Sequence, residues 1–91
     1  MDKLALYRQA LQVFGYDKQL CKLAEEASEL AAESNRLLNH QGLERRLASE
    51  MADVEIMIEQ FRHNGLASLI DFHKQQKLER LAERLGVTYE Q

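Results

Sequence analysis

Hydrophobic residues recur every three or four positions along most of the chain, which is the spacing that places side chains on one face of an α-helix. The pattern predicts helices over about 2–14, 18–38, 43–63 and 66–85. Asp2 and Asp17 stand where N-cap residues are expected. Gly15, Gly65 and Gly86 follow apolar stretches and are expected to end them, because glycine accepts the left-handed conformation that helix ends prefer.

The connections between these helices are short, and residues 39–42 form the expected turn between the second and third. Short connections place successive helices antiparallel, which predicts an all-α fold: an antiparallel helical bundle of about four helices in a single domain, residues 1–91. A chain of 91 residues buries only roughly 60–65% of its unfolded surface, so we expect oligomerisation to complete the bundle. The expected core side of the third helix is Leu43, Leu47, Met51, Val54, Ile58 and Phe61.

Composition narrows the class of protein. The formal net charge of −3 gives no basic footprint for nucleic acid, so we expect no nucleic-acid partner. The apolar runs fall far short of the ~20 residues that span a bilayer, and the N-terminus lacks a signal-peptide core, so we expect no membrane partner. Cys21 is the single cysteine, which suits a reducing compartment. Together these features predict a cytoplasmic protein.

Two pairs of acidic residues carry the candidate chemistry: Glu26 with Glu29, and Glu50 with Asp53. Each pair is separated by three positions, and residues three apart share a face of a helix. If the second and third helices lie side by side, the four carboxylates converge on one small volume. Such a cluster repels itself unless a cation binds, and Mg²⁺ prefers oxygen ligands. We therefore predict a magnesium site, with Mn²⁺ able to substitute.

Surface solvation is the competing explanation, because Glu-x-x-Glu is common on exposed helix faces. Glu50 falls within the apolar arc of the third helix, where a carboxylate is costly unless it is paired, protonated or bound to metal. A salt bridge from an arginine across the bundle would satisfy Glu50 equally well. Glu55 and Glu59 point away from that arc, and we expect both to be solvated.

The fourth helix carries a stripe of cationic side chains, His73, Lys77, Arg80 and Arg84. The stripe continues an apolar face and is therefore expected to point inward. From there Lys77 and Arg80 could meet the phosphates of a metal-bound nucleotide. Lys22 lies near the first acidic pair and could reach phosphate as well. The alternatives are a salt-bridge ridge against the acidic residues or simple solvation.

The acidic residues resemble the EExxE…ExxD signature of the MazG-like, all-α nucleoside triphosphate pyrophosphohydrolases, and the matching residues are Glu25, Glu26, Glu29, Glu50 and Asp53. The similarity extends upstream through Gln19 and Leu23 and downstream to 77–81, and it covers about residues 15–85. Leu81 occupies the stretch where the family usually has an asparagine-type residue. The chain is similar to the short, single-domain members.

The resemblance implies hydrolysis of a nucleoside triphosphate between its α and β phosphates, which yields a monophosphate and pyrophosphate. It implies that the magnesium ligands are Glu26, Glu29, Glu50 and Asp53. It also implies that Glu26 or Glu29 orients the attacking water and that Lys77 and Arg80 contact phosphate. Because family members form dimers or tetramers, the resemblance implies a homodimer or homotetramer.

A non-catalytic alternative uses the same residues. A helical dimerisation or adaptor module, with a structural metal or a salt-bridge cluster, would carry the same acidic pairs. No motif in the chain marks a preference for one base or sugar.

Overall fold

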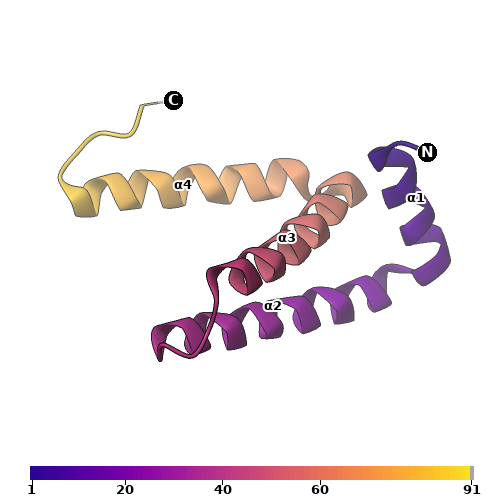
Figure 1. Cartoon of the computed structure of the whole chain (residues 1–91). Coiled ribbons are helices and arrows are strands. Elements are labelled where there is room, and N and C mark those ends of the chain that lie inside the picture. Colours follow the sequence, from indigo (N-terminus) through magenta and orange to yellow (C-terminus); the bar gives the residue numbers. More distant parts are fainter. Residues whose placement is uncertain (91) are drawn as a thin grey trace. The chain divides into compact units, whose positions relative to one another are not determined.

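A computed structural model describes residues 1–90, and within them every regular element is helical, as the hydrophobic pattern predicts. Figure 1 shows the helices in chain order: α1 (Lys3–Phe14), α2 (Tyr16–Leu38), α3 (Glu44–Phe61), the π-helical turn η1 (Arg62–Leu66) and α4 (Ala67–Leu85). The chain forms two compact units, residues 1–60 and the residues from Phe61 onward. No helix in residues 1–90 combines the length and the apolar character needed to cross a membrane.

A single glycine joins α1 to α2. The α1 helix begins as predicted, because the Asp2 side chain accepts a hydrogen bond of 2.8 Å from the Ala5 backbone N–H. Gly15 ends α1 with a φ of 81°, and its carbonyl accepts from the Gln19 N–H at 3.2 Å. Gly15 is therefore also the N-cap of α2, and the prediction that Asp17 caps this helix is wrong. Asp17 lies instead in the first turn, where its charge complements the positive end of the helix.

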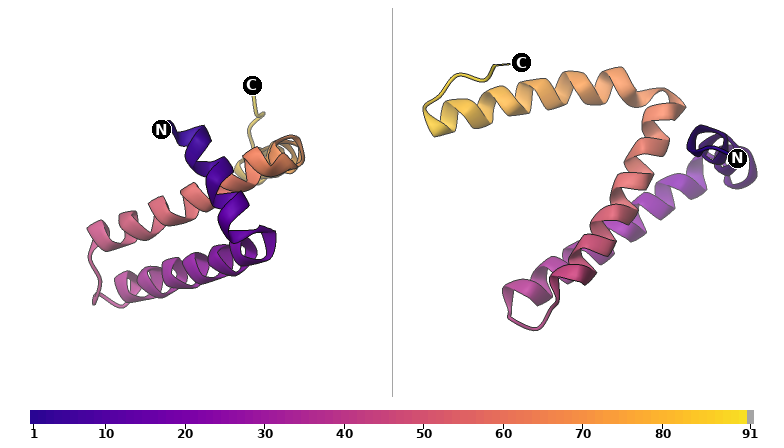
Figure 2. Two further views of the ribbon diagram at one scale, coloured as in Figure 1. Left: turned by 90° about the vertical axis from the view of Figure 1, so that its right-hand side faces the viewer. Right: turned by 45° about the horizontal axis from the view of Figure 1, so that its top comes forward.

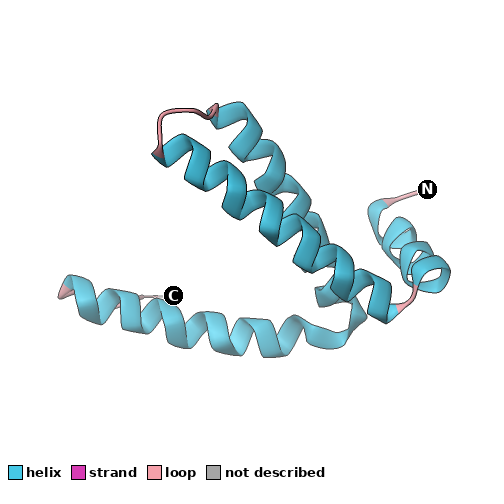
Figure 3. Ribbon diagram, turned by 90° about the horizontal axis from the view of Figure 1, so that it is seen from below, coloured by secondary structure: helices cyan, strands magenta, loops and turns pink. Residues whose placement is uncertain are grey.

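The helices α2 and α3 form an antiparallel hairpin, and Figure 2 (left) and Figure 3 show them running alongside each other. Their register is marked by a hydrogen bond of 2.9 Å from Gln19 Nε2 to Gln60 Oε1. The connecting loop approaches the end of α2 closely at Gly42, where a Cβ atom would lie 2.8 Å from the Leu37 backbone nitrogen. Only glycine fits at that point without movement of the loop.

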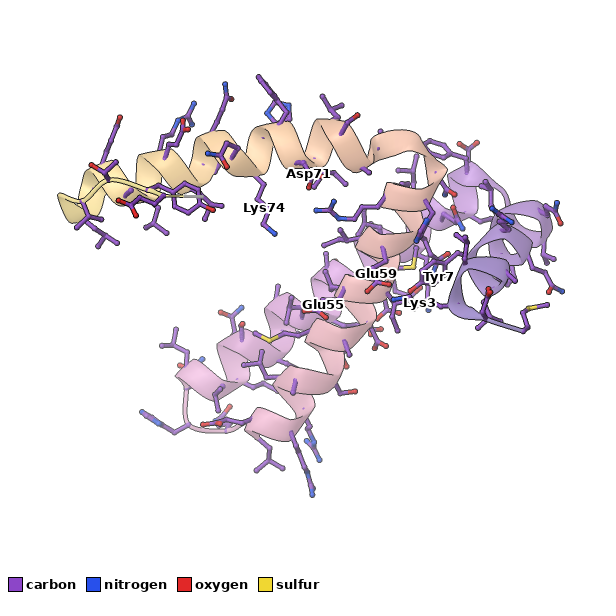
Figure 4. All side chains as sticks on the ribbon, turned by 90° about the horizontal axis from the view of Figure 1, so that it is seen from above. Lys3, Tyr7, Glu55, Glu59, Asp71 and Lys74 are labelled. Carbon is purple, nitrogen blue, oxygen red and sulfur yellow. The ribbon has the colours of Figure 1, made fainter. Side chains whose placement is uncertain are left out.

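The α1 helix is attached to the hairpin through Glu59 of α3. Tyr7 is buried, and its hydroxyl donates a hydrogen bond of 2.8 Å to Glu59 Oε2. Lys3 Nζ lies 3.0 Å from the same oxygen, and Figure 4 shows Lys3 and Tyr7 pointing toward Glu59. Burial raises the pKa of Tyr7, and the hydrogen bond to Glu59 acts in the same direction. The prediction that Glu59 is merely solvated is therefore wrong, whereas Glu55 is exposed as expected.

The side of the third helix that was expected to form the core is only partly buried. Phe61 is buried and Leu47 and Val54 are half-buried. Leu43, Met51 and Ile58 are 44%, 46% and 39% exposed, whereas Met57 is only 5% exposed. The reason is the rotation of α3 about its axis. The positions that face α2 carry the acidic residues and Met57, which leaves Met51 and Ile58 exposed.

The second unit consists of η1 and α4. Gly65 has a φ of 110° within η1, so the glycine expected to end the third helix produces a kink there. Arg62 Nη1 donates a hydrogen bond of 2.8 Å to Asp71 Oδ1 across this kink. At the other end Gly86 adopts the left-handed conformation and closes α4 after Leu85, as the sequence predicts.

Candidate metal centre

The register of the hairpin assembles four carboxylates. Glu26 lies seven residues after Gln19 on α2, and Asp53 lies seven residues before Gln60 on α3. Glu29 and Glu50 lie three residues further in the same directions. Each of the four offers one oxygen, and these oxygens all lie within 4.8 Å of one another. We call this group the acidic cluster, formed by Glu26, Glu29, Glu50 and Asp53. The structure thus brings together the four residues predicted to bind metal.

Burial distinguishes the acidic cluster from an ordinary solvated ridge. Glu26 is only 6% exposed, while Glu50 and Asp53 are half-buried. Glu26 Oε2 and Glu50 Oε2 are buried and receive no hydrogen bond from the described residues. A buried carboxylate oxygen without a donor is costly, and a cation removes that cost. The arginine that would have satisfied Glu50 by a salt bridge is not found among residues 1–90.

The donor set and the spacing fit Mg²⁺. All four side chains offer oxygen, the ligand atom that this ion prefers. Mg²⁺ binds oxygen at about 2.0–2.1 Å, so two oxygens on opposite sides of the ion lie about 4.2 Å apart. The 4.8 Å limit of the acidic cluster is slightly wider than that, and small rotations of the side chains close the difference.

Lys22 supplies the cation nearest to this group. Its ammonium lies 2.9 Å from Glu26 Oε1 and 3.6 Å from Glu25 Oε1. The hydrogen bond with Glu26 raises the pKa of Lys22, and the same contact lowers the pKa of Glu26 against the opposing effect of burial. Lys22 therefore balances one carboxylate of the acidic cluster and leaves the others to repel each other.

The repulsion within the acidic cluster acts mainly on Glu29. The charge of Glu26 raises the pKa of Glu29, and burial and the neighbouring Glu50 act in the same direction. Glu29 is also the one exposed member of the acidic cluster, so its carboxylate faces water. Of the two residues predicted to orient a water molecule, Glu29 has the open position and Glu26 has the paired and buried one.

A pocket of about 480 Å³ opens beside the acidic cluster in the first unit. Glu26 and Asp53 form part of its wall, together with Lys18 and Lys22 of α2. The rest of the wall is apolar or carries carboxamides: Ala10, Phe14, Gln19, Ile56, Met57 and Gln60. Its volume is within the range of small-molecule sites. Lys22 thus lies beside the acidic cluster, and phosphate binding by it stays a prediction.

The predicted phosphate-binding residues of α4 belong to the second unit. Lys77 lines a groove of about 590 Å³ with His73, Arg84 and the apolar stripe of the same helix, whereas Arg80 is exposed outside that lining. The groove is confined to residues of η1 and α4. Phosphate contact by Lys77 and Arg80 stays a prediction.

Sequence reasoning missed two features of this region. The first is the hydrogen bond between Gln19 and Gln60. Its signal in the sequence is that each glutamine lies seven residues from a carboxylate of the acidic cluster on the same helix. The second is Glu33, one turn beyond Glu29 on α2. Its Oε1 is paired with Arg36, while its Oε2 is buried without a donor from the described residues.

Comparisons with protein-family models, with curated proteins and with solved structures each find no match to this chain. The resemblance to the MazG-like family therefore stays a prediction from the motif residues.

Proposed function

We propose that this chain is a Mg²⁺-dependent nucleoside triphosphate pyrophosphohydrolase of the MazG-like type. One observation carries the proposal: four carboxylates from two helices place oxygens within 4.8 Å of one another, and two of their oxygens are buried without a donor among residues 1–90. Lys22 balances only Glu26, so the other carboxylates of the acidic cluster repel one another and favour a bound cation. The adjoining pocket, with two lysines in its wall, suits a phosphorylated ligand.

The residues divide the reaction among them. Glu26, Glu29, Glu50 and Asp53 would hold magnesium, which would supply positive charge to offset the triphosphate and the leaving pyrophosphate. Glu29, the exposed carboxylate, orients a water molecule for in-line attack on the α-phosphorus and accepts its proton. The bond between the α-phosphorus and the α–β bridging oxygen breaks, and pyrophosphate leaves. Lys22, in the wall of the adjoining pocket, stabilises the phosphate oxygens.

The proposal includes a homodimer or homotetramer in which a helical bundle is completed between copies. In the first unit Tyr7 and Met57 are the buried apolar side chains, and Met51, Ile56 and Ile58 of α3 are exposed. Exposed apolar surface of this extent is typical of an interface. Sedimentation-velocity ultracentrifugation should show a species of at least twice the chain mass of 10.6 kDa at micromolar concentration. A monomer at that concentration would contradict this part of the proposal.

The test of activity is pyrophosphate release from a panel of NTPs and dNTPs with magnesium. We expect turnover by the wild-type protein and a loss of at least 100-fold in kcat for Glu50→Gln and for Asp53→Asn, because each removes one charged ligand. Glu55→Gln is the matched control, since Glu55 lies on the same helix, is exposed and is outside the acidic cluster. Figure 4 shows the position of Glu55.

A non-catalytic dimerisation or adaptor module is the second candidate. The exposed apolar side chains of α3 favour it, because an adaptor needs such a surface as much as an oligomeric enzyme does. Absence of turnover in the whole panel, from a protein that stays folded and is stabilised by magnesium, would establish the adaptor with a structural metal.

A further inference from the structure

The pocket beside the acidic cluster has different chemistry at its two ends. Glu26 and Asp53 stand at one end, and the hydrogen-bonded carboxamides of Gln19 and Gln60 stand at the other. Seven residues separate these positions on each helix, which is about 10 Å along a helix axis. That is the span of a nucleoside monophosphate from its base to its phosphate.

The middle of the pocket suits a flat ring. Phe14 and Met57 are in its wall together with the small side chain of Ala10 and the branched side chain of Ile56. An aromatic face and a thioether both make favourable contacts with aromatic rings. Phe14 is exposed and open to a ligand, while Met57 is buried and anchors the wall.

Gln60 is the polar residue that is suited to donate a hydrogen bond to such a ring. Its Oε1 accepts the 2.9 Å hydrogen bond from Gln19, which is itself only 3% exposed and so holds the carboxamide of Gln60 in one orientation. The Nε2 of Gln60 donates to Met57 Sδ at 3.6 Å, and a thioether is a weak acceptor. A ring nitrogen or carbonyl oxygen of a ligand is a stronger acceptor, so a ligand that offers one gains by displacing the sulfur.

We propose that Gln60, oriented by Gln19, is the residue that selects the nucleobase of the triphosphate substrate. The inference rests on the proposed function, because the acidic cluster and the lysines then bind the phosphates while the carboxamides bind the base edge. A base that places no acceptor opposite Gln60 Nε2 leaves this group on its weak hydrogen bond to Met57 Sδ. Sites that recognise a ligand by hydrogen bonds reject ligands that cannot form them, so Gln60 would discriminate between bases.

The first experiment measures kcat/KM for the NTP and dNTP panel and for ribose 5-triphosphate, which has the phosphates and sugar but no base. For the wild-type protein we expect at least a tenfold spread among the bases and the lowest value for ribose 5-triphosphate. Gln60→Leu should lower kcat/KM for the preferred nucleotide by 10- to 100-fold and change that for ribose 5-triphosphate by less than threefold. Gln9→Leu, an exposed glutamine of α1 outside the pocket lining, is the matched control and should change neither.

Equal rates for all bases in the wild-type protein would overturn the inference, as would an equal loss on every substrate, ribose 5-triphosphate included, in Gln60→Leu. The proposed function fails separately, if the wild-type protein hydrolyses no triphosphate at all. In that case NMR of the metal-free protein with nucleoside monophosphates decides. The Gln60 side-chain NH₂ signals, assigned by their loss in Gln60→Leu, should shift with one base more than with the others. Uniform or absent shifts would overturn the inference independently of turnover.

Discussion

Magnesium should stabilise the folded protein, and replacement of Asp53 should remove much of that gain. The four ligands come from two helices, so the acidic cluster exists only when the hairpin is folded and the ion binds the folded state alone. A ligand at 100 times its Kd then adds about 2.7 kcal/mol to the free energy of unfolding. For a chain of 91 residues that raises Tm by about 10 °C or more.

Asp53→Asn replaces one charged ligand by a neutral one of the same size. A tenfold weaker Kd lowers the gain at saturating metal by about 1.4 kcal/mol, which is about 5 °C or more in Tm. Calorimetry in EDTA and in 10 mM MgCl₂ measures both values, and Glu55→Gln controls for loss of charge from α3 outside the acidic cluster. Equal metal-dependent shifts in wild type and Asp53→Asn would refute the metal-binding role of Asp53. No shift in the wild type would refute the site.

Three further outcomes are expected. The pKa of Glu29 is raised above the ordinary 4.5, so folding favours its protonated form. In the metal-free protein, protonated Glu29 therefore stabilises the fold below pH 4.5. This stabilisation is lost as the pH rises through the raised pKa. Urea unfolding from pH 4 to 7 should therefore show a smaller loss of stability in Glu29→Gln, and an unchanged profile would contradict the assignment. Tyr7→Phe removes the hydroxyl that donates to Glu59 and should lower the free energy of unfolding by about 0.5–1.5 kcal/mol in urea titrations. Lys22→Met removes the ammonium beside Glu26 and should tighten magnesium binding severalfold in isothermal titration calorimetry. The same change should raise KM for the nucleotide. Weaker magnesium binding would show that Lys22 organises the acidic cluster instead.

The local features of this chain follow from its sequence. Helical periodicity predicts each helix to within a few residues, and the cap at Asp2 and the stops at Gly15 and Gly86 follow from residue type. The error at Asp17 has a simple cause. Glycine at a positive φ both ends α1 and begins α2, so no separate cap residue is needed between the two helices.

Features that depend on helix rotation do not follow from periodicity alone. An amphipathic pattern shows which residues share a face, but the face that meets the neighbouring helix is set by packing. On α3 the inward positions carry Met57, Glu50 and Asp53, while the expected core residues Leu43 and Met51 are open. Three-residue spacing places each acidic pair on one face of its helix under any rotation, but the meeting of the two pairs also depends on how the helices face each other. The Gln19–Gln60 bond and the attachment of Tyr7 to Glu59 were not predictable, because each depends on the register between helices.

The short loop at Gly42 has a consequence for how the protein folds. All four carboxylates lie within residues 26–53, so their assembly requires only the closure of one helical hairpin between neighbours in the sequence. Glu29 and Glu50 are 21 residues apart and Glu26 and Asp53 are 27 apart, so the carboxylates meet only when this hairpin closes. A hairpin that closes in the folding transition state would let magnesium accelerate folding, whereas one that closes later would let magnesium slow unfolding instead.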